Sequence, residues 1–277
     1  MQYIEYKIDQ VTSEISDILV ALLSNIGFET FNQEESCLYA YIDDNLNTKL
    51  IQEQIETYQQ QFHFNFSFQP MTNKNWNAEW ESNFQPVIVA EQCIIKATFH
   101  KDLPKFPFEI IIEPRMAFGT GHHASTYTMI ESMLNIDFKN LDVCDAGCGT
   151  GVLSIMAALK GAKSIIGIDN NDWAFNNALD NLVLNGMKNK VKIELGELEL
   201  MKSARYDIIL ANINRNIILD YLPMFSNLLK GPKVILLSGI LLEDEQLILE
   251  RAISCGLSLN ESLHREGWTC LTMQLKD

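Results

Sequence analysis

Three glycines at alternate positions follow a short apolar segment in the middle of the chain. The residues are Asp145-Ala146-Gly147-Cys148-Gly149-Thr150-Gly151, and the next apolar segment ends in Asp169. Because glycine has no side chain, such a turn lets the backbone approach a bound molecule closely. The helix expected from Val152 presents N-terminal amides with partial positive charge, and a carboxylate at the end of the next strand can accept hydrogen bonds from ribose hydroxyls. These residue types predict a site for a nucleoside.

The spacing of the glycines distinguishes two kinds of nucleoside ligand. The dinucleotide fingerprint GxGxxG has a third glycine, which lets helix and strand pack beside a pyrophosphate. Counted from Gly147 that position is Val152, and counted from Gly149 it is Ser154. An acidic residue followed by xGxGxG instead resembles the first motif of class I S-adenosylmethionine-dependent methyltransferases, whose ligand has a methionine tail and no phosphate. A phosphate-binding dehydrogenase and a purely structural turn are the alternatives.

The elements that position this motif alternate between strand and helix, which is typical of a mostly parallel sheet covered on both faces. Strands are expected near 87–99, 108–112, 142–145, 164–169, 191–195, 207–211, 234–238, 258–263 and 269–275. Helices are expected near 125–134, 152–160, 173–185, 217–229 and 244–252. By resemblance to class I methyltransferases, residues 87–277 form an α/β, Rossmann-like domain with a seven-stranded sheet and an antiparallel last strand. The ligand is expected beyond the carboxyl ends of the first strands, where Gly147, Asp169 and Asn212 would converge.

Residues 1–70 show a different order of elements. Their periodicity predicts a strand at 4–8, a helix at 15–26, a hairpin of 28–31 and 38–42, a helix at 46–58, and a last strand through Phe62, Phe64, Phe66 and Phe68. This order is the ferredoxin-like plan of a small α/β domain. The four phenylalanines could stack on bases, but a two-layer domain needs such a face against its helices, so we expect them in the core.

A segment bounded by prolines joins the two parts. We expect residues 71–86 to be the linker between a domain at 1–70 and a domain at 87–277. Trp76, Trp80 and Phe84 lie four residues apart, which predicts a short helix with one aromatic stripe. Packing of this stripe against a domain is favoured over contact with a substrate.

Charge is distributed unevenly along the 277 residues. The net charge is -15, and residues 1–70 hold eleven acidic and only two basic residues, so this quarter of the chain carries nine of the fifteen negative charges. A surface this acidic repels nucleic-acid phosphates and attracts cationic partners, although an acidic face also serves solubility alone. We therefore expect no direct contact with nucleic acid.

Composition and terminal sequence favour a cytoplasmic protein. The first residues contain neither a basic leader nor an apolar core, and the longest apolar stretch, near 234–242, is too short to span a bilayer. The six cysteines include no CxxC pair, and the five histidines show no metal-binding spacing. We expect neither disulfides nor a bound metal, and no membrane partner.

Two further segments narrow the family. Residues 113–126 read EPRMAFGTGHHAST and enter a helix, and residues 211–216 read ANINRN and follow the fourth strand of the sheet. Together they resemble the ribosomal protein L11 methyltransferase family (PrmA), in which the first segment reads DPGxAFGTGxHxTT. The matching residues are Pro114, Ala117, Phe118, Gly119, Thr120, Gly121, His123 and Thr126, and the family's tryptophan-rich linker is matched by Trp76 and Trp80.

The resemblance implies a function and a set of site residues. The function is transfer of methyl groups from S-adenosylmethionine to lysine side-chain amines and an N-terminal amine of ribosomal protein L11, with the first domain recognising this substrate. By motif position the cofactor-binding residues are Thr126, Gly147, Asp169 and Asn212. The sequence departs from the family pattern at Glu113, Arg115, Ala124, Ser125 and Ile217. Ile217 stands where the family has a proline, and this change affects the acceptor pocket while leaving Asn212 in place.

The chemistry of methyl transfer suits these residue types. A sulfonium methyl is already activated, so the enzyme must align an amine that has a free lone pair. A lysine has a reference pKa near 10.4, so supplying its neutral form at pH 7 costs about 4.6 kcal/mol, at about 1.36 kcal/mol per unit. A dry pocket lowers this cost because burial disfavours the ammonium form. We expect the side-chain carbonyl of Asn212, with backbone carbonyls of residues 212–214, to orient the amine, while solvent or the pocket takes the proton.

Other residues carry weaker predictions. His122 and His123 are expected to be local hydrogen bonders rather than general bases, and Glu197 lies either near the adenine or in a solvated loop. An RNA base methyltransferase would share the fold, but these enzymes commonly use an NPPY-type motif, whereas Asn212 is followed by Ile213 and Asn214. A non-catalytic cofactor-binding assembly module is the other alternative.

Overall fold

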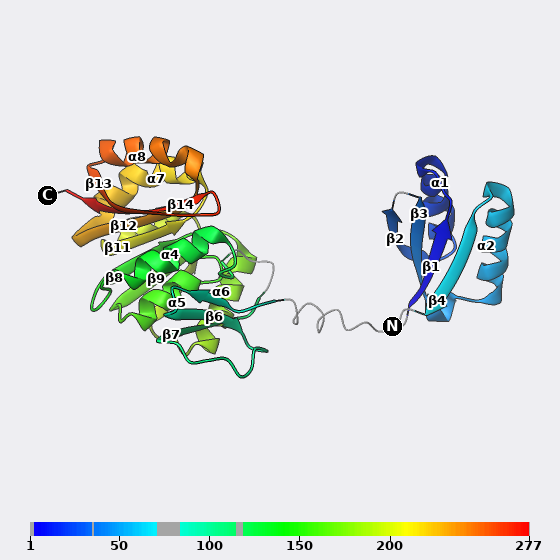
Figure 1. Cartoon of the computed structure of the whole chain (residues 1–277), viewed down its shortest axis with the longest axis horizontal. Helices are drawn as coiled ribbons and strands as arrows, with labels where there is room; N and C mark the ends of the chain where they lie inside the picture. The colour runs from blue at the N-terminus through cyan, green and yellow to red at the C-terminus, as the bar shows by residue number, and fades with distance from the viewer. Residues whose placement is uncertain (1–2, 35, 71–83, 115–118, 277) are drawn as a thin grey trace. The chain divides into compact units, whose positions relative to one another are not determined.

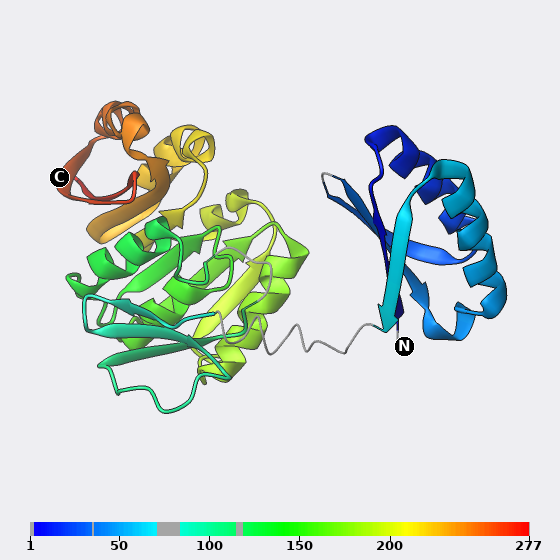
Figure 2. The same cartoon turned by 45° about the vertical axis from the view of Figure 1, so that its right-hand side comes forward.

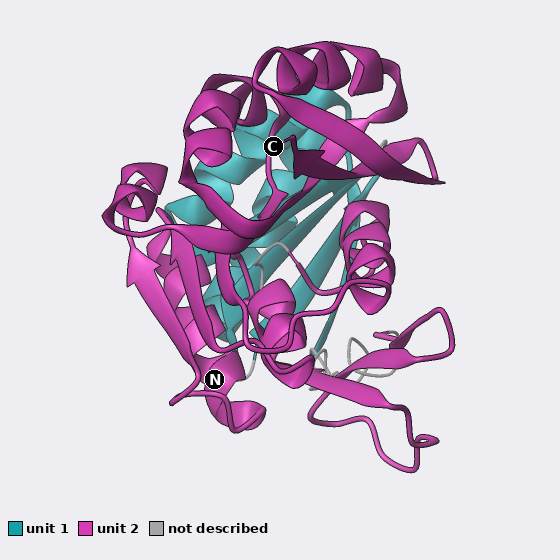
Figure 3. Ribbon diagram, turned by 90° about the vertical axis from the view of Figure 1, so that its left-hand side faces the viewer, with its two compact units in different colours: residues 1–83 teal, residues 84–277 magenta. Residues whose placement is uncertain are grey.

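The structure is a computed structural model that describes residues 3–34, 36–70, 84–114 and 119–276 (Figure 1). The chain divides into two compact units, residues 1–83 and 84–277 (Figure 3). Most of the segment expected to be a linker helix, including Trp76 and Trp80, lies outside the described residues. No helix in the described ranges has the length and apolar character needed to cross a membrane.

The described residues of the first unit form one four-stranded sheet and two long helices. Its elements are β1 (Tyr3–Asp9), α1 (Ser13–Ser24), β2 (Phe28–Glu34), β3 (Cys37–Asp43), a 3-10 turn η1 (Asp44–Leu46), α2 (Lys49–Phe62) and β4 (Asn65–Pro70). The strand order is β2-β3-β1-β4, and every neighbouring pair is antiparallel. This arrangement confirms the predicted ferredoxin-like plan.

Alternation along the strands explains how this unit buries a core. Successive residues of β1 and β3 alternate between buried and partly exposed, so each strand presents one face to the helices. Leu19 of α1 and Ile55 of α2 pack into the same core as Tyr6 of β1, and both helices lie against the sheet in Figure 2. Thr12 caps α1, since its Oγ1 accepts a hydrogen bond from the N–H of Ile15.

The prediction of one strand through four phenylalanines is wrong at its start. Phe62 is the last residue of α2, because His63 adopts a left-handed conformation and its N–H caps the helix at the carbonyl of Gln59. Phe64 is buried, whereas Phe68 is 46% exposed and stacks on Tyr6 with ring centroids 4.9 Å apart. The phenylalanines therefore belong to the core only in part.

The second unit contains a three-stranded and a seven-stranded sheet. The smaller sheet has β5 (Val87–Val89), β6 (Cys93–Ala97) and β7 (Phe108–Ile112), in the order β5-β6-β7. Residues 87–99 do not form the single strand that was predicted. Ala90 and Glu91 take positive φ angles of 46° and 55°, which reverses the chain and pairs β5 with β6 antiparallel.

The larger sheet and its helices follow from α4 onward. The elements are α4 (Ala124–Leu134), β8 (Asp142–Ala146), α5 (Val152–Leu159), β9 (Ser164–Asp169), α6 (Asp172–Leu184), β10 (Val191–Leu195), η2 (Leu198–Ser203), β11 (Tyr206–Asn212), α7 (Arg215–Leu228), β12 (Leu229–Leu241), η3 (Leu242–Asp244), α8 (Glu245–Ser254), β13 (Leu257–Arg265) and β14 (Trp268–Leu275). The strand order is β10-β9-β8-β11-β12-β14-β13, and β14 runs antiparallel to both neighbours while the first five strands are parallel. The predicted seven-stranded sheet with an antiparallel last strand is confirmed.

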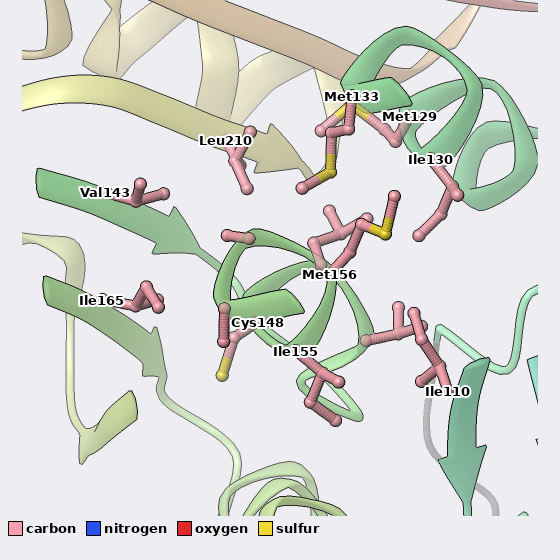
Figure 4. Packing of buried hydrophobic residues seen from close by; sticks show 14 of the residues in the cluster. Ile110, Met129, Ile130, Met133, Val143, Cys148, Ile155, Met156, Ile165 and Leu210 are labelled. Atoms are coloured by element: carbon pink, nitrogen blue, oxygen red, sulfur yellow. The ribbon is translucent and has the colours of Figure 1, made fainter. Parts of the chain in front are cut away.

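Both faces of this sheet are covered. Helices α4, α5 and α6 share one core with β8 and β11, to which Met156 of α5, Met133 of α4 and Leu210 of β11 all belong (Figure 4). Helices α7 and α8 share a second core with the opposite face. The chain leaves β8 toward β9 and later returns beside β8 as β11. The carboxyl ends of these strands therefore form the crevice where open α/β sheets bind ligands.

Candidate active site

The glycine loop between β8 and α5 is held by backbone hydrogen bonds. Gly147 and Cys148 both donate their N–H groups to the carbonyl of Ile168 on β9, at 2.8 and 3.0 Å. Gly147, Gly149 and Gly151 have φ angles of 72°, 53° and 76°, which residues other than glycine rarely adopt. The backbone conformation of the turn therefore requires glycine at these three positions, in addition to the room that glycine leaves for a ligand.

Asp169 organises the loop around its carboxylate. Its Oδ2 accepts the N–H of Gly149 at 2.9 Å, and its Oδ1 accepts the N–H of Asn171 at 3.0 Å. One side chain thus fixes the glycine loop and the start of α6. A carboxylate offers about four acceptor positions, so positions remain for the hydroxyls of a ligand.

Ile213 fills space that two glycines leave open. A Cβ placed on Gly147 would collide with Cγ2 of Ile213, and a Cβ on Gly239 would collide with the carbonyl oxygen of Ile213. Strands β8 and β12 lie on either side of β11. Ile213, which follows β11, therefore fits between Gly147 after β8 and Gly239 in β12, neither of which has a side chain. Gly147 therefore accommodates the Asn212–Asn214 segment, a role that the sequence analysis did not foresee.

Asn212 ends β11 and is 8% exposed. Its Nδ2 donates to Oγ1 of Thr126 at 3.3 Å, while its Oδ1 is buried and has no hydrogen-bond partner among the described residues. Thr126 lies in the first turn of α4 and is fully buried. This bond orients the amide of Asn212 and leaves its buried carbonyl oxygen without a hydrogen bond.

A cavity of about 1120 Å³ opens at the carboxyl ends of the parallel strands. Following the strand order, its wall is formed by Gly196 after β10, Asp169 at β9, Gly147 after β8, Asn212 at β11 and Gly239 in β12. Three of the four predicted site residues therefore meet in one cavity. Thr126 lies behind Asn212 rather than in the cavity wall, and its contact with the cofactor stays a prediction.

Several cavity residues were missed from the sequence. Trp173, Tyr221, Trp268 and Gly239 line the cavity, as does Ile217, which replaces the family's proline. Gly239 could have been found, because it lies near the carboxyl end of a parallel strand. Tyr221 lies four residues after Ile217 on a helix, so it shares the same helix face. No sequence feature near Trp268 predicted its position in the cavity, because it reaches the cavity from the β13–β14 hairpin, which is distant in the chain.

The two neighbouring histidines have structural contacts. Nδ1 of His123 accepts the N–H of Ser125 at the start of α4, and its ring packs edge to face on Trp268 at 4.4 Å. Burial lowers the pKa of His123, so its imidazole is neutral near pH 7. Nε2 of His122 lies 2.8 Å from the carbonyl oxygen of Gln85. These contacts agree with the interpretation of both residues as local hydrogen bonders.

Asp145 is fully buried beneath the glycine loop. Its Oδ2 accepts hydrogen bonds from the N–H and Oγ of Ser154 on α5, while Oδ1 has no hydrogen-bond partner among the described residues. Burial raises the pKa of this carboxyl to about 7, with a smaller contribution from the negative charge of Asp169. The group ties β8 to α5 and stays protonated over much of the acidic range.

The charge of the cavity favours a cationic ligand. The described residues in its wall include Asp169 and Glu197 but no lysine, arginine or histidine. A pyrophosphate would meet no cation there, whereas a sulfonium with an ammonium-bearing tail would meet carboxylates. The glycine cradle, the acceptor positions of Asp169 and the free carbonyl of Asn212 fit S-adenosylmethionine.

Strand order, glycine loop and terminal acid together define a class I S-adenosylmethionine-dependent methyltransferase. The sequence pattern of the family described as "Ribosomal protein L11 methyltransferase (PrmA)" matches residues 8–276. The chain belongs to this family.

Individual relatives agree with this assignment. The chain is 37% identical over 282 residues to a ribosomal protein L11 methyltransferase of Phocaeicola vulgatus, with 100% of both chains covered. It is 38% identical over 285 residues to one from Porphyromonas gingivalis, covering 98% of this chain and 97% of the relative. A crystal structure titled ribosomal protein L11 methylase, from Lactobacillus delbrueckii subsp. bulgaricus, superposes with a TM-score of 0.65 at 25% identity, covering 70% of this chain and 100% of that one.

The close fit of Ile213 against Gly147 predicts an energetic coupling. Gly147→Ala is expected to lower the free energy of unfolding by about 1–3 kcal/mol more than Gly186→Ala, since a Cβ at Gly186, with a φ of 66°, meets no atom within 4 Å. Adding Ile213→Ala to Gly147→Ala is expected to recover part of this difference. Denaturant unfolding of wild type, Gly147→Ala, Ile213→Ala and the double variant measures the coupling between the two positions. Strict additivity would contradict the proposed collision.

The raised pKa of Asp145 predicts a dependence of stability on pH. Between the ordinary pKa of 3.8 and the folded pKa of about 7, the unfolded chain releases this proton while the folded chain keeps it. The contribution of Asp145 to stability therefore falls as pH rises through this window, by roughly 1 kcal/mol per pH unit, and is constant above it. Asp145→Asn should remove this slope. Equal pH slopes of unfolding free energy for wild type and variant would exclude the effect.

Proposed function

We propose that this enzyme transfers methyl groups from S-adenosylmethionine to amines of ribosomal protein L11, namely lysine side chains and an N-terminal amine. The names of its relatives support the substrate, and the buried, unpartnered Oδ1 of Asn212 supports an amine acceptor. A ribosomal acceptor would place the enzyme in the cytoplasm.

The strand order suggests how the donor lies. Gly147 and Asp169 are neighbours along the sheet edge, followed by Gly196 after β10. With the ribose on Asp169, the methionine tail would lie over the glycine loop and the adenine toward β10. The reacting methyl would then lie on the β11 side, toward Asn212. The donor supplies an activated methyl at its sulfonium, and the protein residues provide binding and alignment.

Asn212 is the residue that we propose to orient the acceptor. A buried carbonyl without a hydrogen bond costs about 1–3 kcal/mol, and an amine N–H at this position would recover that energy. In the observed orientation Nδ2 is engaged by Oγ1 of Thr126, so Oδ1 is the amide atom that we propose to receive the acceptor N–H. An amide is not a strong base, so the proton leaves to solvent after the amine has been aligned.

The acceptor side of the cavity is apolar and aromatic. Ile213, Ile217 and Trp268 line the cavity together with Asn212, whereas the hydroxyl of Tyr221 donates to Glu199 of η2 at 2.9 Å. Such walls disfavour an ammonium ion and so lower the free energy needed to present a neutral lysine amine. This environment complements the carboxylates at the donor end.

The first unit supports recognition of a basic protein. Residues 1–70 carry nine of the fifteen net negative charges of the chain. Opposite charge on a ribosomal protein would steer association and strengthen it at low salt. We propose that this unit recognises the substrate, and that the enzyme has no direct nucleic-acid partner.

Replacing Asn212 tests the proposed alignment. Asn212→Ala is expected to lower kcat/KM for methylation of L11 about tenfold to a hundredfold, because one hydrogen bond to the acceptor is lost. Asn227→Ala, an exposed asparagine near the far end of α7, serves as the control and should leave the rate unchanged. Transfer rates are measured with labelled donor, and donor affinity by calorimetry. Full transfer by Asn212→Ala with unchanged donor affinity would refute the role.

The choice of acceptor can be tested separately. Labelled S-adenosylmethionine is incubated with the enzyme and either purified ribosomal proteins or ribosomal RNA. Label is expected in L11 alone, at lysines and the N-terminus, as located by mass spectrometry. Label in RNA would establish the base-methyltransferase alternative, and donor binding without any transfer would establish the non-catalytic one.

A further inference from the structure

Trp173 is 80% exposed, the largest exposed fraction among the large apolar side chains of the described residues. It lies in the first turn of α6, where its N–H donates to Oδ1 of Asn171 at 2.8 Å. The same Oδ1 accepts the N–H of Ala174 at 3.1 Å. The cap thus fixes the backbone, while the indole ring extends into solvent with no ring of the described residues stacked on it.

This exposed indole lies at one end of the cavity. It lines the cavity with Asn170 and Ala174 of the β9–α6 segment and with Leu198, which follows β10. Asn170 reaches the residues that follow β10, since its Nδ2 donates to Oε1 of Glu197 at 3.3 Å, and β10 lies on the side of β9 opposite to β8 and β11. If the ribose lies on Asp169, this is the adenine end.

Besides Trp173, the aromatic side chain at this end is Tyr221, whose hydroxyl donates to Glu199, next to Leu198, at 2.9 Å. Gly196 and Ala174 are small, and Leu198 is aliphatic and buried. An indole that stacks on a purine removes apolar faces of both rings from water and gains the attraction between offset aromatic rings. Stacking of bases on aromatic side chains is worth enough to weaken binding several-fold when the side chain is removed.

We propose that the Trp173 indole stacks on the adenine ring of the donor and closes the adenine end of the cavity. Only the side-chain torsions have to change, because the Asn171 cap holds the backbone at the start of α6. Trp173 is then a donor-binding residue that recognises the base, separate from the alignment of the acceptor by Asn212. This inference rests on the donor placement in the proposed function.

Calorimetry with two ligands tests the contact. S-adenosylhomocysteine contains adenine, ribose and tail, whereas 5'-methylthioadenosine lacks the amino-acid tail. Trp173→Ala is expected to raise Kd for both ligands by the same factor, at least fivefold. Trp173→Phe should restore most of the affinity, because it keeps an aromatic face. Val183→Ala, at an exposed position on the same helix, is the matched control and should bind both ligands like wild type.

Fluorescence provides a second readout. Binding of S-adenosylhomocysteine should change the tryptophan emission of wild type, and most of this change should disappear in Trp173→Phe. Wild-type affinity of Trp173→Ala for both ligands would overturn the inference. An emission change that is as large in Trp173→Phe as in wild type but absent in Trp268→Phe would also overturn it, since Trp268 lines the cavity too. Unchanged ligand affinity with reduced methylation of L11 would instead assign Trp173 to the protein acceptor. If wild type bound neither ligand, the donor placement itself would fail.

Discussion

The arrangement of the site depends on the carboxylate of Asp169. It receives the N–H of Gly149 from the glycine loop and the N–H of Asn171 from the start of α6, so one side chain fixes two segments that enclose the donor end of the cavity. Charge-assisted bonds of this kind are stronger than neutral ones. Because the glycine loop is also tied to the carbonyl of Ile168, the loop and β9 form one unit against which a ribose can be positioned.

Two buried oxygens that have no hydrogen-bond partner among the described residues belong to β8 and β11, which are neighbours in the sheet. Oδ1 of Asn212 belongs to a residue of the cavity wall, and we propose that the acceptor amine satisfies it. Oδ1 of Asp145 belongs to a fully buried carboxyl, and the molecule relieves the cost of burial by raising its pKa to about 7 and keeping the proton. The first oxygen is the one that we propose to align the acceptor, and the second belongs to the contact that holds β8 against α5.

The cavity has two ends with opposite physical character. Small residues and the carboxylates of Asp169 and Glu197 suit a cationic, polar donor, whereas Ile217 and Trp268 suit an amine that must lose its charge before it reacts. Asn212 stands between these ends. The strand order explains the separation, since β8, β9 and β10 supply the first end and β11, β12 and β14 contribute to the second.

The amino-acid sequence by itself determined the features that depend on local periodicity and on residue type. Alternating strands and helices, the glycine loop, Asp169 and Asn212 were all predicted, because parallel strands bring their carboxyl ends together. Tertiary structure alone decided the fit of Ile213 between Gly147 and Gly239, the position of Thr126 behind Asn212, and the approach of Trp268 to the cavity. These contacts join residues far apart in the chain. The chain reversals at His63 and Ala90 were also missed, because residues other than glycine take left-handed conformations there and their types do not signal it.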